Sequence, residues 1–350
     1  MAPTHVWVKR NLFPSLSSGL LTLVLAGVII VLVKAIFNWA VTDATISGTT
    51  RAACDAGGAC WTFIKVRFDL FFYGRYPSPE RWRVDLALAL VVGTTAATLI
   101  APPRWQGWLA LILLGVVPAV AGILLVGGLF GLAYIATNLW GGLMLNVLLT
   151  AVAGGGGFIL GVFLALGRRS KYPVIRLFSM LFIELWRGVP LLTVLFMAML
   201  LVPLFMPNGA TIDNLLRAML ALTLFTAAYM AEIVRGGLQA IPRGQAEAAT
   251  ALGLRPWAIQ SFIVMPQALR LVIPGLVNTV IDLFKDTTLV SIVGLFDLLA
   301  VITQAQKDQA WLGMAREGYA FAVVVFFLCC FGMSLFSRRL EHRLNRHLRY

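Results

Sequence analysis

Charge and histidine are both scarce in this chain of 350 residues. Charged residues account for 12% of the sequence, whereas hydrophobic residues account for 60%. So little polar surface cannot coat a soluble globule of this size, which predicts that a lipid bilayer surrounds the protein. The histidines are His5, His342 and His347, all near the ends of the chain. This placement excludes histidine-based metal sites and catalytic triads.

Lysine is also rare, and no lysine belongs to a phosphate-binding loop. The pattern Gly-x-x-x-x-Gly-Lys-Ser/Thr, which cradles nucleotide phosphates, occurs nowhere in the sequence. We therefore expect this chain to bind no ATP, metal or other cofactor. An enzyme that works within the membrane is the weakest of the functional classes considered.

The cysteines form two sequence pairs with different surroundings. Cys329 and Cys330 lie in an apolar run and are expected to be packing residues. Cys54 and Cys60 flank a Gly-rich polar loop, and they can form a disulfide if this loop faces an oxidising compartment. A metal site would need further ligands, which the neighbouring sequence lacks.

The positive charge has two explanations. The 28 lysines and arginines exceed the 15 acidic residues by 13. In a soluble protein this excess would indicate a polyanion such as nucleic acid as partner. Here the arginines cluster between apolar runs, so membrane topology and anionic lipid headgroups explain them, and no nucleic acid is expected.

Eight stretches are long and apolar enough to be predicted as membrane spans. A helix needs about 20 mostly apolar residues to cross about 30 Å of hydrocarbon. The predicted spans are Leu16–Phe37, Val84–Ile100, Trp108–Ile135, Leu143–Leu166, Val174–Phe205, Leu215–Val234, Leu269–Val293 and Tyr319–Phe336. The expected fold class is an all-α polytopic membrane protein.

Basic residues near the span ends predict the orientation. They gather on one side of the eight-span arrangement, and the positive-inside rule assigns that side to the cytoplasm. Both termini are then cytoplasmic. The segment Ala40–Arg83 lies outside although it holds several arginines, because the rule is weak in long loops. The residues that set the orientation are Lys9, Arg10, Arg104, Arg168, Arg169, Lys171, Arg176, Arg338, Arg339, Arg343, Arg346 and Arg349.

The chain is expected to divide near Asn138–Gly142. Residues 1–138 would hold a cytoplasmic start, three spans and a periplasmic loop. Residues 139–340 would form a five-span core with a cytoplasmic loop near 236–268, and residues 341–350 a basic cytoplasmic tail. In the core, Gly154–Gly157 is predicted to be a face for close helix packing rather than a hinge. Proline residues that we expect to bend or end helices are Pro190, Pro203, Pro207 and Pro274.

The break between the sixth and seventh spans predicts a short exposed helix. Pro242 favours a helix start, the Ala-rich run Gln245–Leu252 favours helix, and Gly253 tolerates the left-handed cap conformation. A second segment begins at Pro256 and leads into Pro266, with apolar residues that would hold it at the membrane surface.

At these residues the sequence resembles the EAA loop of ATP-binding-cassette importer permeases. The matching residues are Glu247-Ala248-Ala249, Gly253, Ile263 and Met265-Pro266, with Met265 where the pattern usually has Leu. Both residues have similar volumes, so the departure weakens the resemblance little. Three further motifs are similar to those of the polar amino-acid branch, which takes up His, Glu, Gln or Arg: Glu184-Leu-Trp-Arg187-Gly188-Val-Pro190, Ala231-Glu232-Ile-Val-Arg235-Gly236 and Lys285-Asp286-Thr287-Thr288-Leu289.

The resemblance covers roughly Leu143 to Arg339 and implies a type I ABC importer transmembrane fold. The three-span extension before it is similar to that of the larger permeases associated with acidic and amide amino acids. Implied partners are two ATP-binding-cassette ATPase subunits, a second permease that is identical or homologous, a periplasmic amino-acid-binding protein and membrane lipids, all at a bacterial inner membrane. ATP would be bound by the partner subunits. The residues implied in coupling to the ATPase are Gln245, Glu247, Ala248, Ala249, Gly253 and Pro266.

The seventh span carries ionisable residues, which are costly inside a bilayer and usually face a cavity or a partner. Two interpretations stay open for Lys285. It can pair with Asp282, three residues earlier, as a structural ion pair. Alternatively, Lys285 meets the substrate carboxylate and Asp286 its ammonium group. Further residues predicted on the substrate path are Thr287, Thr288, Asn278, Arg187 and Tyr229.

A secondary transporter or channel that acts alone is the alternative function. Such a protein should show internal repeats with interrupted helices and buried carboxylates for ion coupling, and it should work without an ATPase. The ordered series of motifs favours the importer permease instead.

Overall fold

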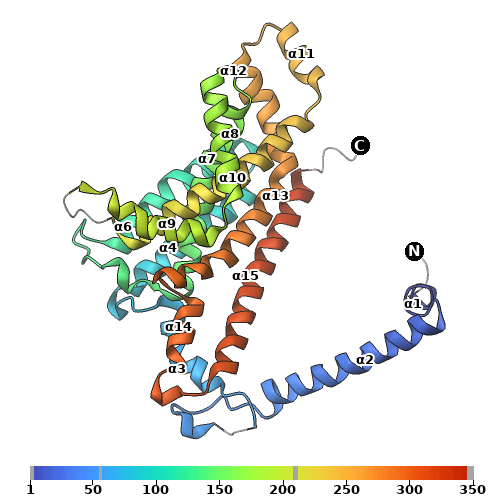
Figure 1. Cartoon of the computed structure of the whole chain (residues 1–350), viewed down its shortest axis with the longest axis vertical. Helices are drawn as coiled ribbons and strands as arrows, with labels where there is room; N and C mark the ends of the chain where they lie inside the picture. The colour runs from blue at the N-terminus through green and yellow to red at the C-terminus, as the bar shows by residue number, and fades with distance from the viewer. Residues whose placement is uncertain (1–3, 55–56, 208–211, 345–350) are drawn as a thin grey trace. The chain divides into compact units, whose positions relative to one another are not determined.

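A computed structural model describes residues 4–54, 57–207 and 212–344 (Figure 1). The predicted tail residues Arg346 and Arg349 lie outside the described residues. The chain separates into two compact units. The first contains Met1–Phe68 and Ala305–Phe321, and the second contains Asp69–Gln304 and Ala322–Tyr350. The domain boundary near Asn138 stays a prediction.

The described chain is almost entirely helical, which confirms the all-α prediction. Helices α3 (Trp61–Tyr73), α14 (Leu298–Ala305) and α15 (Ala315–Leu344) each contribute residues to both units. The other helices of the second unit are α4 (Arg81–Ile100), α5 (Pro103–Leu111), α6 (Val117–Val126), α7 (Gly142–Arg168), α8 (Pro173–Gly188), α9 (Leu191–Leu204), α10 (Asn214–Ala240), α11 (Arg243–Ala251), α12 (Pro256–Ala258) and α13 (Met265–Asp286). Short 3-10 and π turns and a two-residue strand, β1 (Phe296–Asp297), join them.

Helices α7 and α10 form the centre of the second unit. Their contact depends on glycines of α7, because an added Cβ at Gly156 or Gly157 would lie only 3.0 Å from Thr223 or Thr226 of α10. At Gly161 an added Cβ would lie 3.0 Å from the backbone of Ala227. Glycine therefore lets the two backbones approach closely, and the predicted packing role of this small-residue run agrees with the structure.

Among the described residues, six helices are long and apolar enough to cross a membrane. A seventh span results if α8 and α9, bent by 106° at the break between them, count as one. The bend falls where Pro190 was expected to interrupt the predicted Val174–Phe205 span, and Pro190 is the residue directly before α9. The predicted Val84–Ile100 span does form a helix, α4, but α4 is not among the six.

The predicted Trp108–Ile135 span is too long at its end. Its helical part runs from Arg104 to Val126 and stops at Gly127. Gly127, Gly128 and Gly131 all have positive φ angles, between 71° and 79°, so the chain turns there. Glycine adopts this conformation without steric penalty, which explains the early end.

The seventh predicted span starts earlier than expected. Helical structure runs from Pro256 to Val293, because the segment after Pro256 continues through the π turn Ile259–Val264 into α13. Pro266 lies just after this π turn, inside the continuous helical stretch, where it cannot donate a backbone N–H. Pro274 was expected to bend or end a helix. It lies inside α13, so it does not end one.

The first unit begins with α1 (Thr4–Leu12) and α2 (Leu16–Phe37), whose start is capped by Ser15. The apolar side chains of α2 are exposed, as suits a lipid-facing helix. Two segments far apart in the sequence meet here. Phe63 packs on Trp311 with ring centroids 5.5 Å apart, Arg67 pairs with Asp308, and the Cys60 N–H donates to a buried carboxylate, Glu317, at 3.3 Å.

Candidate functional site

The predicted exposed helix is α11, and its limits follow the local sequence signals. It begins at Arg243, directly after Pro242, and ends at Ala251. Gly253 follows with φ +76°, the left-handed conformation that was predicted for it. Figure 1 shows α11 and α12 together at one end of the second unit. The helix therefore stands at an end of the bundle, available to a partner.

One face of α11 is buried and the other is free. Ala249 is 3% exposed and packs in an apolar cluster with Ile259 and Val264, whereas Gln245, Glu247 and Ala248 are exposed. Ala249 thus seats the helix on the chain itself. The face that remains for a partner carries the Glu247 carboxylate and the small Ala248 side chain.

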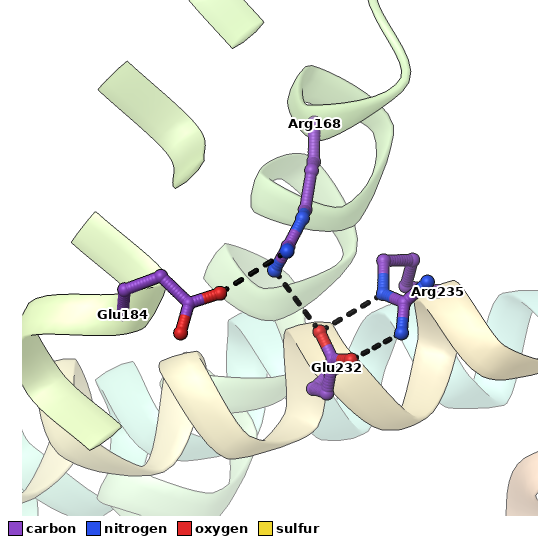
Figure 2. A network of polar contacts seen from close by, with 4 residues as sticks. All are labelled: Arg168, Glu184, Glu232 and Arg235. Atoms are coloured by element: carbon purple, nitrogen blue, oxygen red, sulfur yellow. Dashed lines mark hydrogen bonds and ion pairs between the residues drawn. The ribbon is translucent and has the colours of Figure 1, made fainter. Parts of the chain in front are cut away.

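Four charged residues form a network between three helices (Figure 2). Arg168, at the end of α7, donates to Glu184 of α8 at 3.1 Å and to Glu232 of α10 at 3.2 Å. Glu232 also accepts from Arg235 Nε at 2.9 Å and from its terminal nitrogen. The charges balance, and the Glu232 carboxylate is the shared acceptor. The sequence motifs contain Glu184, Glu232 and Arg235, but the contact of Arg168 with both glutamates was not predicted.

Two of the predicted path residues meet beside this network. The Arg187 guanidinium of α8 lies over the Tyr229 ring of α10, 5.8 Å from its centroid. The Tyr229 ring also lies 5.0 Å from the Phe225 ring. This cation–π contact brings together a cation and an aromatic face on the two helices that Arg168 joins.

Lys285 is paired in the manner of the first interpretation. Its Nζ lies 2.8 Å from Asp282 Oδ1, and both side chains are more than half exposed, at 55% and 66%. Asp286 forms no ion pair within the described part of the chain. Thr288 donates its hydroxyl to the Lys285 carbonyl at 2.8 Å, and Asn278 is exposed on the same helix. Among the described residues, none of these side chains forms a hydrogen bond or ion pair with Arg187 or Tyr229.

Thr287 is fully buried and belongs to a polar cluster that the sequence did not reveal. Asn146 of α7 donates to Thr287 Oγ1 at 2.8 Å and to Asp297 at 3.3 Å, and it accepts from the Leu298 N–H at 2.9 Å. Burial raises the pKa of Asp297, and its hydrogen bonds with the Ala300 and Leu299 N–H groups oppose that rise. The cluster fixes the start of α14 against α7. No local pattern pointed to it, because Asn146 is more than 140 residues from Thr287 and Asp297.

Cys54 and Cys60 form a disulfide with Cα atoms 5.5 Å apart. Cys329 and Cys330 are free and half-buried, in agreement with a packing role. Cys60 also pairs in a β-bridge with Thr45, which precedes the loop that the disulfide closes. Asp55, inside this loop, lies outside the described residues.

We expect the disulfide to face the periplasm, because bridges persist in oxidising compartments. In intact spheroplasts, a membrane-impermeant thiol reagent should label Cys54 and Cys60 after reduction and not before. The Cys54→Ser/Cys60→Ser variant controls for labelling of Cys329 and Cys330. Labelling that requires a permeabilised membrane would contradict the predicted orientation.

Comparison with known proteins identifies the family. Residues 157–346 match the family described as "Binding-protein-dependent transport system inner membrane component", which is more than half of the chain. The chain belongs to this family. It is therefore a multi-pass inner-membrane protein, and membership favours a transport-system subunit over a transporter that acts alone.

Two relatives match along nearly the whole chain. The "Inner membrane amino-acid ABC transporter permease protein YhdY" of Escherichia coli K12 is 48% identical, covering 97% of this chain and 93% of the relative. The "Glutamate/glutamine/aspartate/asparagine transport system permease protein BztC" of Rhodobacter capsulatus is 38% identical with the same coverage. A solved structure, "Crystal structure of an amino acid ABC transporter with histidines", is 30% identical with a TM-score of 0.51, covering 57% of this chain and 91% of the other. These likenesses agree with the type I importer fold.

Proposed function

We propose that this chain is the permease subunit of an ATP-driven importer for acidic and amide amino acids or for L-amino acids in general. The observation that carries the proposal is the similarity over 97% of the chain, N-terminal extension included, to two permeases whose names specify amino acids. In this role the chain forms the translocation path and catalyses no reaction itself.

The exposed face of α11 is the proposed contact with the ATPase subunits. Glu247 offers a carboxylate for a cation of the partner, and Ala248 leaves room for close approach. The segment that follows α11 begins near Gly253, with its left-handed backbone, and ends at Pro266, in the first turn of α13. Two ATPase subunits, a second permease and a periplasmic binding protein complete the proposed complex, with both termini of this chain in the cytoplasm.

The proposed substrate path uses residues that offer both charges of an amino acid. Asp286 has no ion-pair partner among the described residues and can meet the ammonium group. Lys285 can exchange Asp282 for the substrate carboxylate, because an exposed ion pair contributes about 0 to 1 kcal/mol and is readily opened. Further residues proposed to line the path are Asn278, Thr288, Arg187 and Tyr229, and Thr287, whose side chain is fully buried against Asn146, is proposed to support the path from behind.

Uptake into proteoliposomes tests this function directly. The complex of both permeases, ATPase subunits and binding protein should accumulate radiolabelled L-glutamate or L-glutamine when ATP is enclosed with the ATPase. Omission of the ATPase subunits should abolish uptake. Uptake that persists without them would indicate a transporter that acts alone and would contradict the proposal.

Substitution of the path residues should weaken uptake of all transported amino acids alike, because the backbone charges are common to them. We expect this result for Lys285→Met and for Asp286→Asn, with ATP hydrolysis retained as evidence of assembly. Asp282→Asn is the matched control, since it removes the partner of Lys285 without removing a proposed contact. An equal loss in Asp282→Asn and Lys285→Met would assign Lys285 to a purely structural pair.

A further inference from the structure

Asn146 lies where three segments of the second unit meet. It belongs to α7, and its side chain contacts both the 3-10 turn Thr287–Val293, which follows α13, and the start of α14. Asn146, Thr287 and Asp297 are all fully buried. A buried amide is costly unless its polar atoms are paired, because water cannot reach them. Solvent therefore cannot replace the hydrogen bonds of Asn146 if they are lost.

The orientation of the Asn146 amide follows from its partners. The Leu298 N–H is a donor, so the atom that it contacts at 2.9 Å is the oxygen Oδ1. Nδ2 is then the donor to Thr287 Oγ1 at 2.8 Å and to Asp297 at 3.3 Å. The Thr287 hydroxyl gives its own proton to the Phe284 carbonyl at 2.7 Å. A directed chain of hydrogen bonds thus runs from α7 into the last turn of α13.

This chain ends at the turn that carries Lys285 and Asp286. Helix α13 ends at Asp286, and Thr287 begins the 3-10 turn. A 3-10 helix is wound more tightly than an α-helix, so an earlier change from one to the other would rotate Asp286 about the helix axis. The hold on Thr287 therefore sets the direction of the two charged side chains before it.

Apolar packing holds the same turn close to its neighbours. Leu283 is buried, and an added Cβ at Gly154 of α7 would lie 3.7 Å from it. Phe284 is also buried, with its ring centroid 5.1 Å from that of Phe326 of α15. Apolar burial is non-directional, so these contacts do not fix the rotation of the turn. The hydrogen bonds that begin at Asn146 are directional and do fix it.

We infer that Asn146 is a positioning residue for the substrate path, which holds Lys285 and Asp286 in the direction that binds the amino acid. This role rests on the proposed function, because it takes Lys285 and Asp286 as the substrate contacts. Asn146 acts through Thr287, since it is itself fully buried. Figure 1 shows α11 at one end of the second unit and α14 toward the other. Loss of Asn146 should therefore weaken capture of the amino acid and leave the proposed ATPase contact intact.

The number of amino acids transported per ATP hydrolysed tests this role. It is measured with radiolabelled L-glutamine in proteoliposomes that contain the whole importer, with saturating binding protein. Thr287→Val removes the hydroxyl and keeps the shape of the side chain. It should lower the ratio about tenfold, the effect of leaving one buried donor unpaired. Asn146→Ala should lower the ratio at least as far, and Thr287→Ser, which keeps the hydroxyl, should retain most of it.

Thr150→Val is the matched control. Thr150 is buried one turn further along α7, and its hydroxyl donates to the Asn146 carbonyl at 2.7 Å within that helix. The transport ratio of this variant should stay unchanged. A merely structural role of Asn146 would lower uptake and ATP hydrolysis together, because fewer intact complexes remain. An unchanged ratio in Thr287→Val would overturn the inference, as would equal impairment of Thr287→Ser and Thr287→Val. If Asn146→Ala fails to assemble, the Thr287 pair decides alone.

Lys285→Met and Asp286→Asn separate failure of this inference from failure of the proposed function. A lowered ratio in these two variants with a normal ratio in Thr287→Val overturns only the role of Asn146. A normal ratio in all three contradicts the proposed substrate path and the inference with it. Absence of ATP-dependent uptake by the unmodified importer contradicts the proposed function itself.

Discussion

Amino-acid uptake is expected to fall by roughly 30-fold or more in Glu247→Lys, because reversing a charge at a desolvated contact costs about 2 to 5 kcal/mol. Glu247 is exposed on α11, and no described residue of this chain forms an ion pair with it. The substitution should therefore leave the fold intact while repelling a cationic partner. Membrane insertion and the yield of purified permease should match those of the unmodified protein.

The measurement is ATP-dependent uptake together with co-purification of the ATPase subunits. Glu341→Lys is the matched control, because it makes the same change at an exposed residue near the end of α15. Gly253→Val adds a second approach, since a β-branched residue is strained at a positive φ although no atom obstructs its Cβ. Normal uptake and normal co-purification in Glu247→Lys would exclude α11 as the contact.

The second large effect is expected on stability. Glu232→Ala should lower the free energy of unfolding by about 3 kcal/mol, because it leaves Arg168 and Arg235 without their shared carboxylate. Glu232 is 24% exposed, so water replaces the lost partner only in part. Helices α7 and α10 would lose the ion pair between Arg168 and Glu232 that joins them at this network.

Glu184→Ala is the matched control within the same network. Glu184 is 57% exposed and forms one ion pair, so its removal should cost under about 1 kcal/mol. Thermal unfolding of the purified permease, followed by the loss of its monodisperse chromatographic peak, compares the variants. Equal destabilisation by the two alanine substitutions would show that Glu232 is not the centre of the network.

Local signals predicted the parts of the structure that depend on neighbouring residues. Pro242 and Gly253 delimit α11 because each acts on its own backbone, and Pro190 marks the bend for the same reason. The ion pair of Lys285 with Asp282 was one of the two interpretations left open, and it could be foreseen because a spacing of three residues places both on one helix face.

The parts that sequence reasoning missed depend on distant residues. The cluster of Asn146, Thr287 and Asp297 joins segments more than 140 residues apart, and no periodicity reports such a contact. Arg168 was interpreted only as a topology signal, since its reach to Glu232 depends on the packing of α7 on α10. The glycine turn after Val126 was overlooked because the surrounding run is apolar throughout.

The contacts of the first unit impose an order on synthesis. Cys60 and Glu317 are 257 residues apart, and Arg67 and Asp308 are 241 apart. At about 5 to 20 residues per second, the ribosome needs roughly 10 to 50 s to make the intervening chain. During that interval the loop is held by its disulfide and by local contacts such as the β-bridge between Thr45 and Cys60. Phe63 cannot pack on Trp311 until the later segment has been synthesised. The first part of the chain to be translated is therefore among the last to complete its packing.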